Sequence, residues 1–152
     1  MNVLIGIGTY TQEDDGVGLR IAEHIDEKGL ATNFKVVEMG GNLTNILFYC
    51  NADTENILVV DCVKMGAQPG DYRFFSRDEV ETLKTVDTLS THGGDVLKVI
   101  DLGAQLNYPL PSIYFLGIEP KSLSDEMELS SVLKEKFQDY IDVACDFMKN
   151  LS

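Results

Sequence analysis

Short, unbroken apolar runs alternate along the chain with longer stretches in which apolar residues recur at helical spacing. The unbroken runs are rich in β-branched residues and predict strands at 3–7, 34–37, 57–60 and 112–116. A further edge strand is expected at 71–75, after the turn Pro69-Gly70. Continuous rather than alternating apolarity is typical of parallel strands that are covered on both faces.

Apolar residues at spacings of three and four predict helices between these strands. The first helix is marked by Val17, Ile21, Ala22 and Ile25. Two more are expected over 43–50 and from about His92 to Gly103. A long closing helix is marked by an apolar face of Leu133, Phe137, Tyr140, Ile141, Ala144, Phe147, Met148 and Leu151.

This alternation of strands and helices predicts the fold class. We expect an α/β three-layer sandwich, with a largely parallel twisted sheet and helices on both faces. Repeats, linkers and low-complexity segments are not visible, so a single domain over 1–152 is expected. In open sheets of this kind, ligands bind beyond the carboxyl ends of the strands. Residues that directly follow a strand are therefore the first candidates for chemistry.

Charge and cysteine usage narrow the class of partner. The chain has 152 residues, of which 25 are acidic and 12 basic, giving a net charge of −13. Such a surface repels phosphates, so neither nucleic acid nor an anionic membrane is expected as a partner. Neither a membrane-spanning run nor a secretory signal is visible, which predicts a cytoplasmic protein. The three scattered cysteines predict reduced thiols rather than a disulfide framework.

The glycine-rich stretch Gly6-Ile7-Gly8 raises the question of a phosphate-binding loop. A dinucleotide fingerprint needs a third glycine three residues after the second, and Thr11 stands there instead. The loop continues to Asp14 and Asp15, whose charges would repel a pyrophosphate at the start of the following helix. We therefore expect this loop to present a carboxylate rather than to bind a phosphate.

Three polar residues fall on one edge of the predicted sheet. Asp15 follows the first strand, Asp61 ends the strand at 57–60, and His92 precedes a later helix. Two carboxylates and an imidazole can bind a borderline divalent metal such as zinc or nickel. The sequence therefore predicts a metal site formed by Asp15, Asp61 and His92.

Each of these residues also has a simpler interpretation. Asp15 could cap the first helix, Asp61 could be paired structurally because a buried acid needs a partner, and His92 could lie in a surface turn. A thiol nucleophile formed by Cys62 with His92 is a further alternative. Cys62 follows Asp61 in a strand, however, and should point the opposite way, into the core.

Six segments keep a characteristic order and spacing: Gly6-Ile7-Gly8, Asp14-Asp15-Gly16-Val17-Gly18, Val59-Val60-Asp61, Pro69-Gly70, Ser90-Thr91-His92 and Gly117-Ile118-Glu119-Pro120. In these segments the chain resembles the hydrogenase maturation endopeptidases, which trim the large subunit of [NiFe] hydrogenases. Two stretches differ from the usual family pattern. Thr9 stands in place of an asparagine, and 39–42 reads Met-Gly-Gly-Asn in place of Asp-Gly-Gly-Thr.

The resemblance implies a function and a set of site residues. It implies an endopeptidase, of aspartyl or metal-dependent type, in which Asp15, Asp61 and His92 contact nickel. The partner would be the precursor of a [NiFe] hydrogenase large subunit, which loses its C-terminal extension after nickel insertion. Nickel would come from the substrate, with zinc or cadmium as a surrogate in crystals. Gly40 and Gly41 would let the substrate tail approach the backbone. The alternative is a non-proteolytic metal-binding or chaperone module that recognises a nickel-bearing partner.

Overall fold

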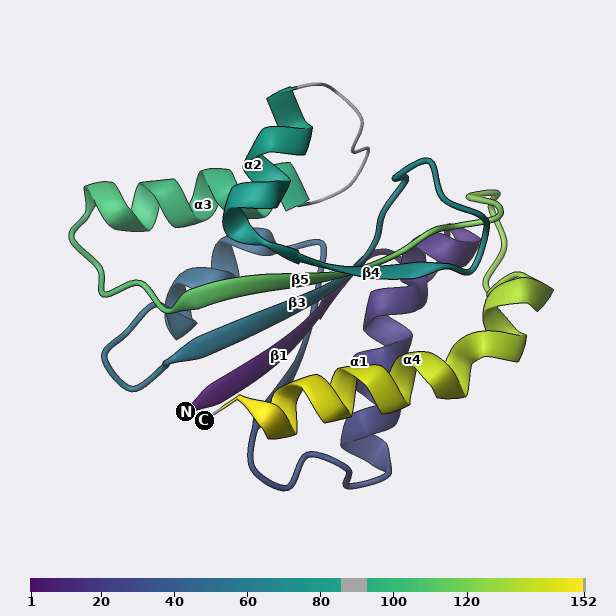
Figure 1. Ribbon diagram of the computed structural model, residues 1–152, viewed down its shortest axis with the longest axis horizontal. Helices are drawn as coiled ribbons and strands as arrows, with labels where there is room; N and C mark the ends of the chain where they lie inside the picture. The colour runs from purple at the N-terminus through teal and green to yellow at the C-terminus, as the bar shows by residue number, and fades with distance from the viewer. Residues whose placement is uncertain (86–92, 152) are drawn as a thin grey trace.

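A computed structural model describes residues 1–85 and 93–151 of the chain (Figure 1). In chain order the helices and strands are β1 (Asn2–Ile7), η1 (Glu13–Gly16), α1 (Val17–Glu27), β2 (Lys35–Gly40), η2 (Leu43–Tyr49), β3 (Asn56–Cys62), β4 (Tyr72–Ser76), α2 (Arg77–Thr85), α3 (Gly93–Gln105), β5 (Ser112–Ile118) and α4 (Ser131–Asn150). Among the described residues, none of the helices has the length and apolar composition that crossing a membrane requires.

The described strands form one five-stranded sheet in the order β2-β1-β3-β5-β4. The pairs β1–β2, β1–β3 and β3–β5 are parallel, and β4 runs antiparallel to β5 at one side of the sheet. The prediction of a largely parallel sheet with an added edge strand is confirmed. We call the edge where β1, β2, β3 and β5 end the carboxyl edge, and the opposite one the amino edge.

Alternate residues of the central strands face two separate layers of helices. Leu58 and Val60 of β3 belong to a core shared with α1 and α4. Ile57 and Val59 belong to a second core shared with η2 and α3. The helices accordingly cover both faces of the sheet (Figure 1). The predicted three-layer α/β sandwich is therefore confirmed.

The start of α1 lies unusually close to the ends of β1 and β3. A Cβ atom at Gly18 would be 2.1 Å from the carbonyl oxygen of Val60 and 2.6 Å from that of Ile7. Since both neighbours are backbone atoms, a larger residue would push the helix away from the sheet. The buried stripe of α1, made by Val17, Ile21, Ala22 and Ile25, anchors the rest of the helix. This approach brings the residues just before α1 to the carboxyl edge.

Three elements differ from the sequence-based expectation. The helix predicted over 43–50 is a 3-10 helix, η2. The helix expected to end at Gly103 continues to Gln105. Gly103 lies inside it, where an added Cβ would be 3.0 Å from the side chain of Leu47 of η2. The helix α2, which is short and mostly polar and buries Val80, was not predicted from the sequence.

Candidate active site

Asp15 is held at the carboxyl edge by the loop that follows β1. Gly8 has a φ of +132° and lies directly against the backbone of Asp15, a conformation that few other residues adopt. The backbone N–H of Thr9 donates a hydrogen bond of 3.0 Å to Oδ2 of Asp15. The N-cap residue of α1 is Gly16, so the helix-cap interpretation of Asp15 is wrong. The contact uses the backbone N–H of Thr9, which any residue other than proline could supply at this position.

Asp61 lies near the end of β3 and is only 1% exposed. Its Oδ1 accepts a hydrogen bond of 2.7 Å from the backbone N–H of Cys62. Because side chains alternate along a strand, Asp61 is directed to the same face as Ile57 and Val59. That face is the one covered by α3.

The structure brings two of the three predicted site residues to the same edge of the sheet. β1 and β3 are neighbours, with Gly6 paired to Val60 just before both strands end, and η1, which carries Asp15, contacts β3. His92 lies outside the described residues. The first residue of α3, Gly93, follows it directly in the sequence.

Cys62 lies on the opposite face from Asp61 and is 4% exposed. It belongs to the core shared with α1 and α4, so the expectation that it points into the core is confirmed. Burial raises the pKa of the Cys62 thiol well above its usual range, and the negative charges of Asp61, Asp15, Asp14 and Glu119 raise it further. A thiol in this environment stays protonated, which argues against a Cys62 nucleophile.

Asp14 is a buried acid whose role the sequence analysis missed. Its side chain is 0% exposed. Oδ2 accepts hydrogen bonds from the backbone N–H groups of Lys121 and Ser122, at 2.8 and 3.1 Å. Ser130 donates to Oδ1 through its backbone and to Oδ2 through its hydroxyl, at 2.7 and 2.8 Å. Asp14 therefore joins η1 to the segment between β5 and α4.

Glu119, which follows β5, was also missed and is 7% exposed. Its Oε1 accepts hydrogen bonds from the backbone N–H groups of Met65 and Ala67, at 3.0 and 2.8 Å. These two residues belong to the segment that follows Asp61 and β3. The signal in the sequence was the same as for Asp61, namely an acid placed directly after an apolar strand.

The two glycines expected near the substrate lie at the end of β2. The backbone N–H of Gly8 donates a hydrogen bond of 3.4 Å to the carbonyl oxygen of Gly40, which places Gly40 beside the loop that leads to Asp15. In the described part of the chain, no atom lies within 4 Å of the Cβ that either glycine would gain. The backbone at 40–41 is therefore open for another chain to approach.

A cavity of about 450 Å³ opens where the carboxyl edge meets α4. Its wall is formed by the segment after β3, the start of β4 and one side of α4, and includes Met65, Asp71, Arg73, Lys136 and Asp139. The hydroxyl of Tyr140 donates a hydrogen bond of 2.6 Å to the carbonyl oxygen of Gly70 and fixes this wall. The cavity has charges of both signs and is large enough for a few residues of a peptide.

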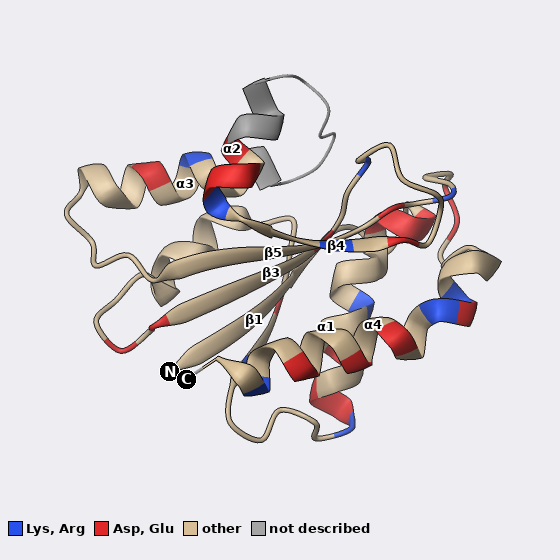
Figure 2. Cartoon of the chain, viewed as in Figure 1, with Lys and Arg blue, Asp and Glu red and all other residues tan. Residues whose placement is uncertain are grey.

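Acidic residues outnumber basic ones in the molecule as a whole. They lie on α1, on α4 and on the loops at the carboxyl edge (Figure 2). At that edge, Asp14, Asp15, Asp61 and Glu119 come from three separate segments and raise the pKa of one thiol together. By its fold and candidate site, the protein is an α/β protein with a carboxylate-rich site beyond the ends of its parallel strands. Enzymes of this architecture bind their ligands at that place.

The chain belongs to the hydrogenase maturation protease family, since the model of that family matches residues 19–147. The Hydrogenase 3 maturation protease of Escherichia coli is 27% identical over 137 residues, which cover 88% of this chain and 82% of that protein. The [NiFe] hydrogenase maturation protease HybD from Thermococcus kodakarensis is 27% identical with a TM-score of 0.76, over 97% of this chain and 98% of that one.

The fold is also shared with the hydrogenase maturating endopeptidase HybD from E. coli. That structure has a TM-score of 0.81 at 16% identity and covers 97% of this chain and 91% of that one. The family consists of peptidases, and this chain is therefore a peptidase of the hydrogenase maturation type. The expected family and fold class are confirmed.

Proposed function

We propose that this protein removes the C-terminal extension from the precursor of a [NiFe] hydrogenase large subunit, after nickel has been inserted. The substrate's own nickel would be the feature that the protease recognises. Membership of the family supports the peptidase activity. The relative from T. kodakarensis, which is named as a [NiFe] hydrogenase maturation protease, supports the kind of substrate.

The observation that carries the proposal is the placement of Asp15 and Asp61 at the same edge of the sheet. A charged carboxylate as buried as Asp61 is costly unless it is paired or binds a metal. Together with His92, the two carboxylates would supply oxygen and nitrogen ligands suited to nickel or to a zinc surrogate. Three protein ligands leave positions open for groups of the substrate and for water.

The chemistry would depend on how the substrate's nickel meets the scissile peptide bond. A divalent metal either polarises the carbonyl or lowers the pKa of a bound water, and both routes lead to hydrolysis. Asp15 and Asp61 would hold the nickel-bearing centre in place, so that the scissile bond lies beside them. A Ser or Cys nucleophile is not required, in agreement with the buried, protonated state of Cys62.

The removed peptide would lie along the carboxyl edge. The open backbone at Gly40 and Gly41 offers one approach beside the loop that carries Asp15. The cavity of about 450 Å³ begins on the segment that follows Asp61 and offers room on the other side. Its mixed charges would suit a peptide with both polar and charged side chains.

A cleavage assay on nickel-loaded precursor tests the proposal. The wild-type protein should release the C-terminal peptide, seen as a loss of mass from the precursor, and a nickel-free precursor should stay intact. Asp15→Ala, Asp61→Ala and His92→Ala should each stop the release. Continued release by all three variants would contradict the assignment of the site. Binding of the loaded precursor without any loss of mass would instead indicate a non-proteolytic module.

A further inference from the structure

The two buried acids missed in the sequence, Asp14 and Glu119, have a feature in common. Both accept hydrogen bonds mainly from backbone N–H groups of segments at the carboxyl edge. A carboxylate that accepts several backbone N–H bonds fixes the main chain around it. Both acids therefore fix the backbone conformation of the loops that donate hydrogen bonds to them.

The Asp14 contacts fix the loop that carries Asp15. Further main-chain bonds run between the same segments, from Glu13 N–H to the Glu126 carbonyl at 2.8 Å and from Asp14 N–H to the Ser122 carbonyl at 3.2 Å. Asp15 is the next residue along η1, so its position depends on this attachment.

The Glu119 contacts fix the segment that follows Asp61. Besides the bonds from Met65 and Ala67, the main chain of Glu119 accepts a bond from Gly70 N–H and donates one to the Asp71 carbonyl, each of 2.8 Å. The backbone N–H of Val63 also donates to the Ile118 carbonyl at 2.9 Å. The end of β5 thus holds the chain on the far side of Asp61.

These two sets of contacts meet in one short stretch of chain. Glu119 holds the segment after Asp61, and Lys121 and Ser122 hold Asp14. We propose that Asp14 and Glu119 are positioning residues for peptide cleavage, which set the separation of the Asp15 and Asp61 carboxylates through the stretch 119–122. This inference rests on the proposed function of the site.

The hydrogen-bond pattern makes the two acids respond differently to amide substitution. The hydrogen bonds from Met65 and Ala67 to the Glu119 side chain both end on Oε1, so the carbonyl oxygen of a glutamine can accept them. Asp14 instead accepts through both oxygens. An asparagine there would turn its NH₂ group toward an N–H donor and lose at least one bond. Glu119→Gln should therefore preserve the geometry, whereas Asp14→Asn should not.

The test compares the kcat for cleavage of nickel-loaded precursor in Asp14→Asn, Glu119→Ala, Glu119→Gln and the wild type. We expect Asp14→Asn and Glu119→Ala to lower kcat by about 10- to 100-fold, the range found for residues that orient metal ligands. Glu119→Gln should restore kcat to within about threefold of the wild type. Asn2→Ala, which removes buried polar contacts at the amino edge, is the control for lost stability.

A second readout does not depend on activity. Amide hydrogen exchange should become faster at Met65 and Ala67 in Glu119→Ala, and at Lys121 and Ser122 in Asp14→Asn, with slow exchange kept in β1 and β3. Should these variants fail to fold, Glu119→Asp and Ser130→Ala, which weaken the same contacts, are measured in the same way.

Folded variants that keep wild-type kcat would overturn the inference, as would a Glu119→Gln protein as slow as Glu119→Ala. A wild-type protein that does not cleave the loaded precursor would instead contradict the proposed function. The two failures are thus distinguishable.

Discussion

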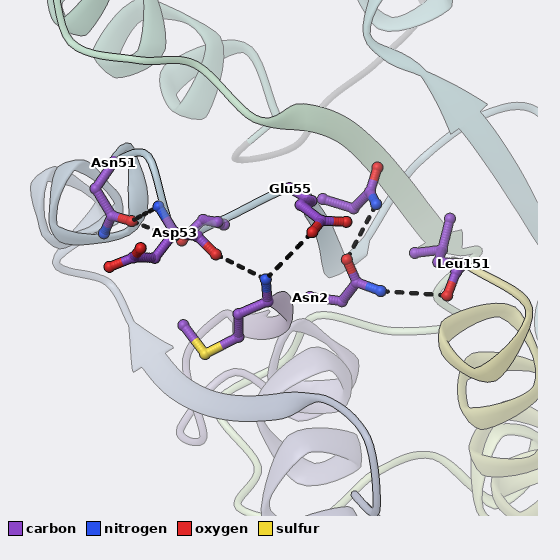
Figure 3. A network of polar contacts seen from close by, with 8 residues as sticks. Asn2, Asn51, Asp53, Glu55 and Leu151 are labelled. Carbon is purple, nitrogen blue, oxygen red and sulfur yellow. Dashed lines mark hydrogen bonds and ion pairs between the residues drawn. The ribbon is translucent and has the colours of Figure 1, made fainter.

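The two edges of the sheet are both polar, but they are built from different groups. At the amino edge, Asn2 donates a hydrogen bond of 3.3 Å to the Leu151 carbonyl and accepts one of 3.0 Å from Asn56 (Figure 3). The N-terminal amino group donates to the Asp53 carbonyl at 2.7 Å and lies 3.9 Å from Glu55. At the carboxyl edge, the buried polar groups include the carboxylates of Asp14, Asp61 and Glu119.

The two edges therefore differ in how much free energy it costs to bury their polar groups. The amide side chains of Asn2 and Asn56 donate and accept without carrying charge, so they join the two ends of the chain at a small desolvation cost. The charged N-terminal amino group at this edge is exposed. Buried carboxylates are far more costly unless N–H groups, cations or metals compensate them. Their concentration at the carboxyl edge, where this architecture binds ligands, is therefore the stronger sign of a site.

The largest effect is expected from neutralising the carboxyl edge. Asp61→Asn keeps an oxygen that can accept the Cys62 N–H bond, but it removes the charge that would bind the substrate's metal. We expect kcat/KM for the nickel-loaded precursor to fall by at least about 100-fold. Urea denaturation of the variant checks that it is folded under the conditions of the cleavage assay. Activity within threefold of the wild type would contradict the role of Asp61.

The next effect comes from the close contact that places α1 against the strand ends. Gly18→Ala would bring a methyl group within 2.1 Å of the Val60 carbonyl oxygen. We expect the free energy of unfolding to fall by about 3 kcal/mol. Gly41→Ala is the matched control for stability, because no described atom lies within 4 Å of the added Cβ. Equal stability of both variants would show that α1 does not need this contact.

A smaller effect is expected at the amino edge. Asn2→Ala removes the bonds to Leu151 and Asn56 and should lower the free energy of unfolding by about 1–2 kcal/mol. Cleavage of the precursor at a temperature where the variant is folded should be unchanged. A loss of kcat in the folded variant would mean that the two edges are coupled.

The smallest effect concerns the cysteines. Cys50, Cys62 and Cys145 all lie in the described part of the chain, and each is a buried free thiol. Burial raises the pKa of each thiol, which lowers the fraction of reactive thiolate at any given pH. At pH 8, alkylation should be at least about tenfold slower in the folded protein than in urea. Rapid labelling of Cys62 in the folded protein would reopen the thiol hypothesis.

Much of the fold could be predicted because the local signals agreed with one another. The unbroken run at 57–60 can be buried on both faces in a parallel sheet, and β3 is found there. The helix α2 was missed because its nine residues are mostly polar, and among its described side chains the buried one is Val80. Gly103 was expected to end a helix, but α3 continues to Gln105, and the glycine lies where an added Cβ would be only 3.0 Å from Leu47.

The site was predictable to the extent that it follows the ends of strands. The placement of Asp15 and Asp61 at one edge could be predicted because topology alone sends these positions there. The difference between Asp14 and Asp15 was not accessible in the same way, since adjacent acids look alike in a sequence. The difference is visible only in the structure, where Asp14 accepts hydrogen bonds from Lys121, Ser122 and Ser130. These residues lie more than a hundred positions further along the chain.

The proposed function requires that the carboxyl edge, and not the amino edge, binds the metal. Anomalous diffraction from crystals of the wild-type protein soaked with cadmium measures this directly. We expect an anomalous peak between the carboxylates of Asp15 and Asp61, at about 2.0–2.6 Å from their oxygens. The same soak of Asp61→Asn crystals should show no peak there. A peak in the wild-type protein at Asp53 and Glu55 of the amino edge, with none beside Asp61, would contradict the proposed metal site.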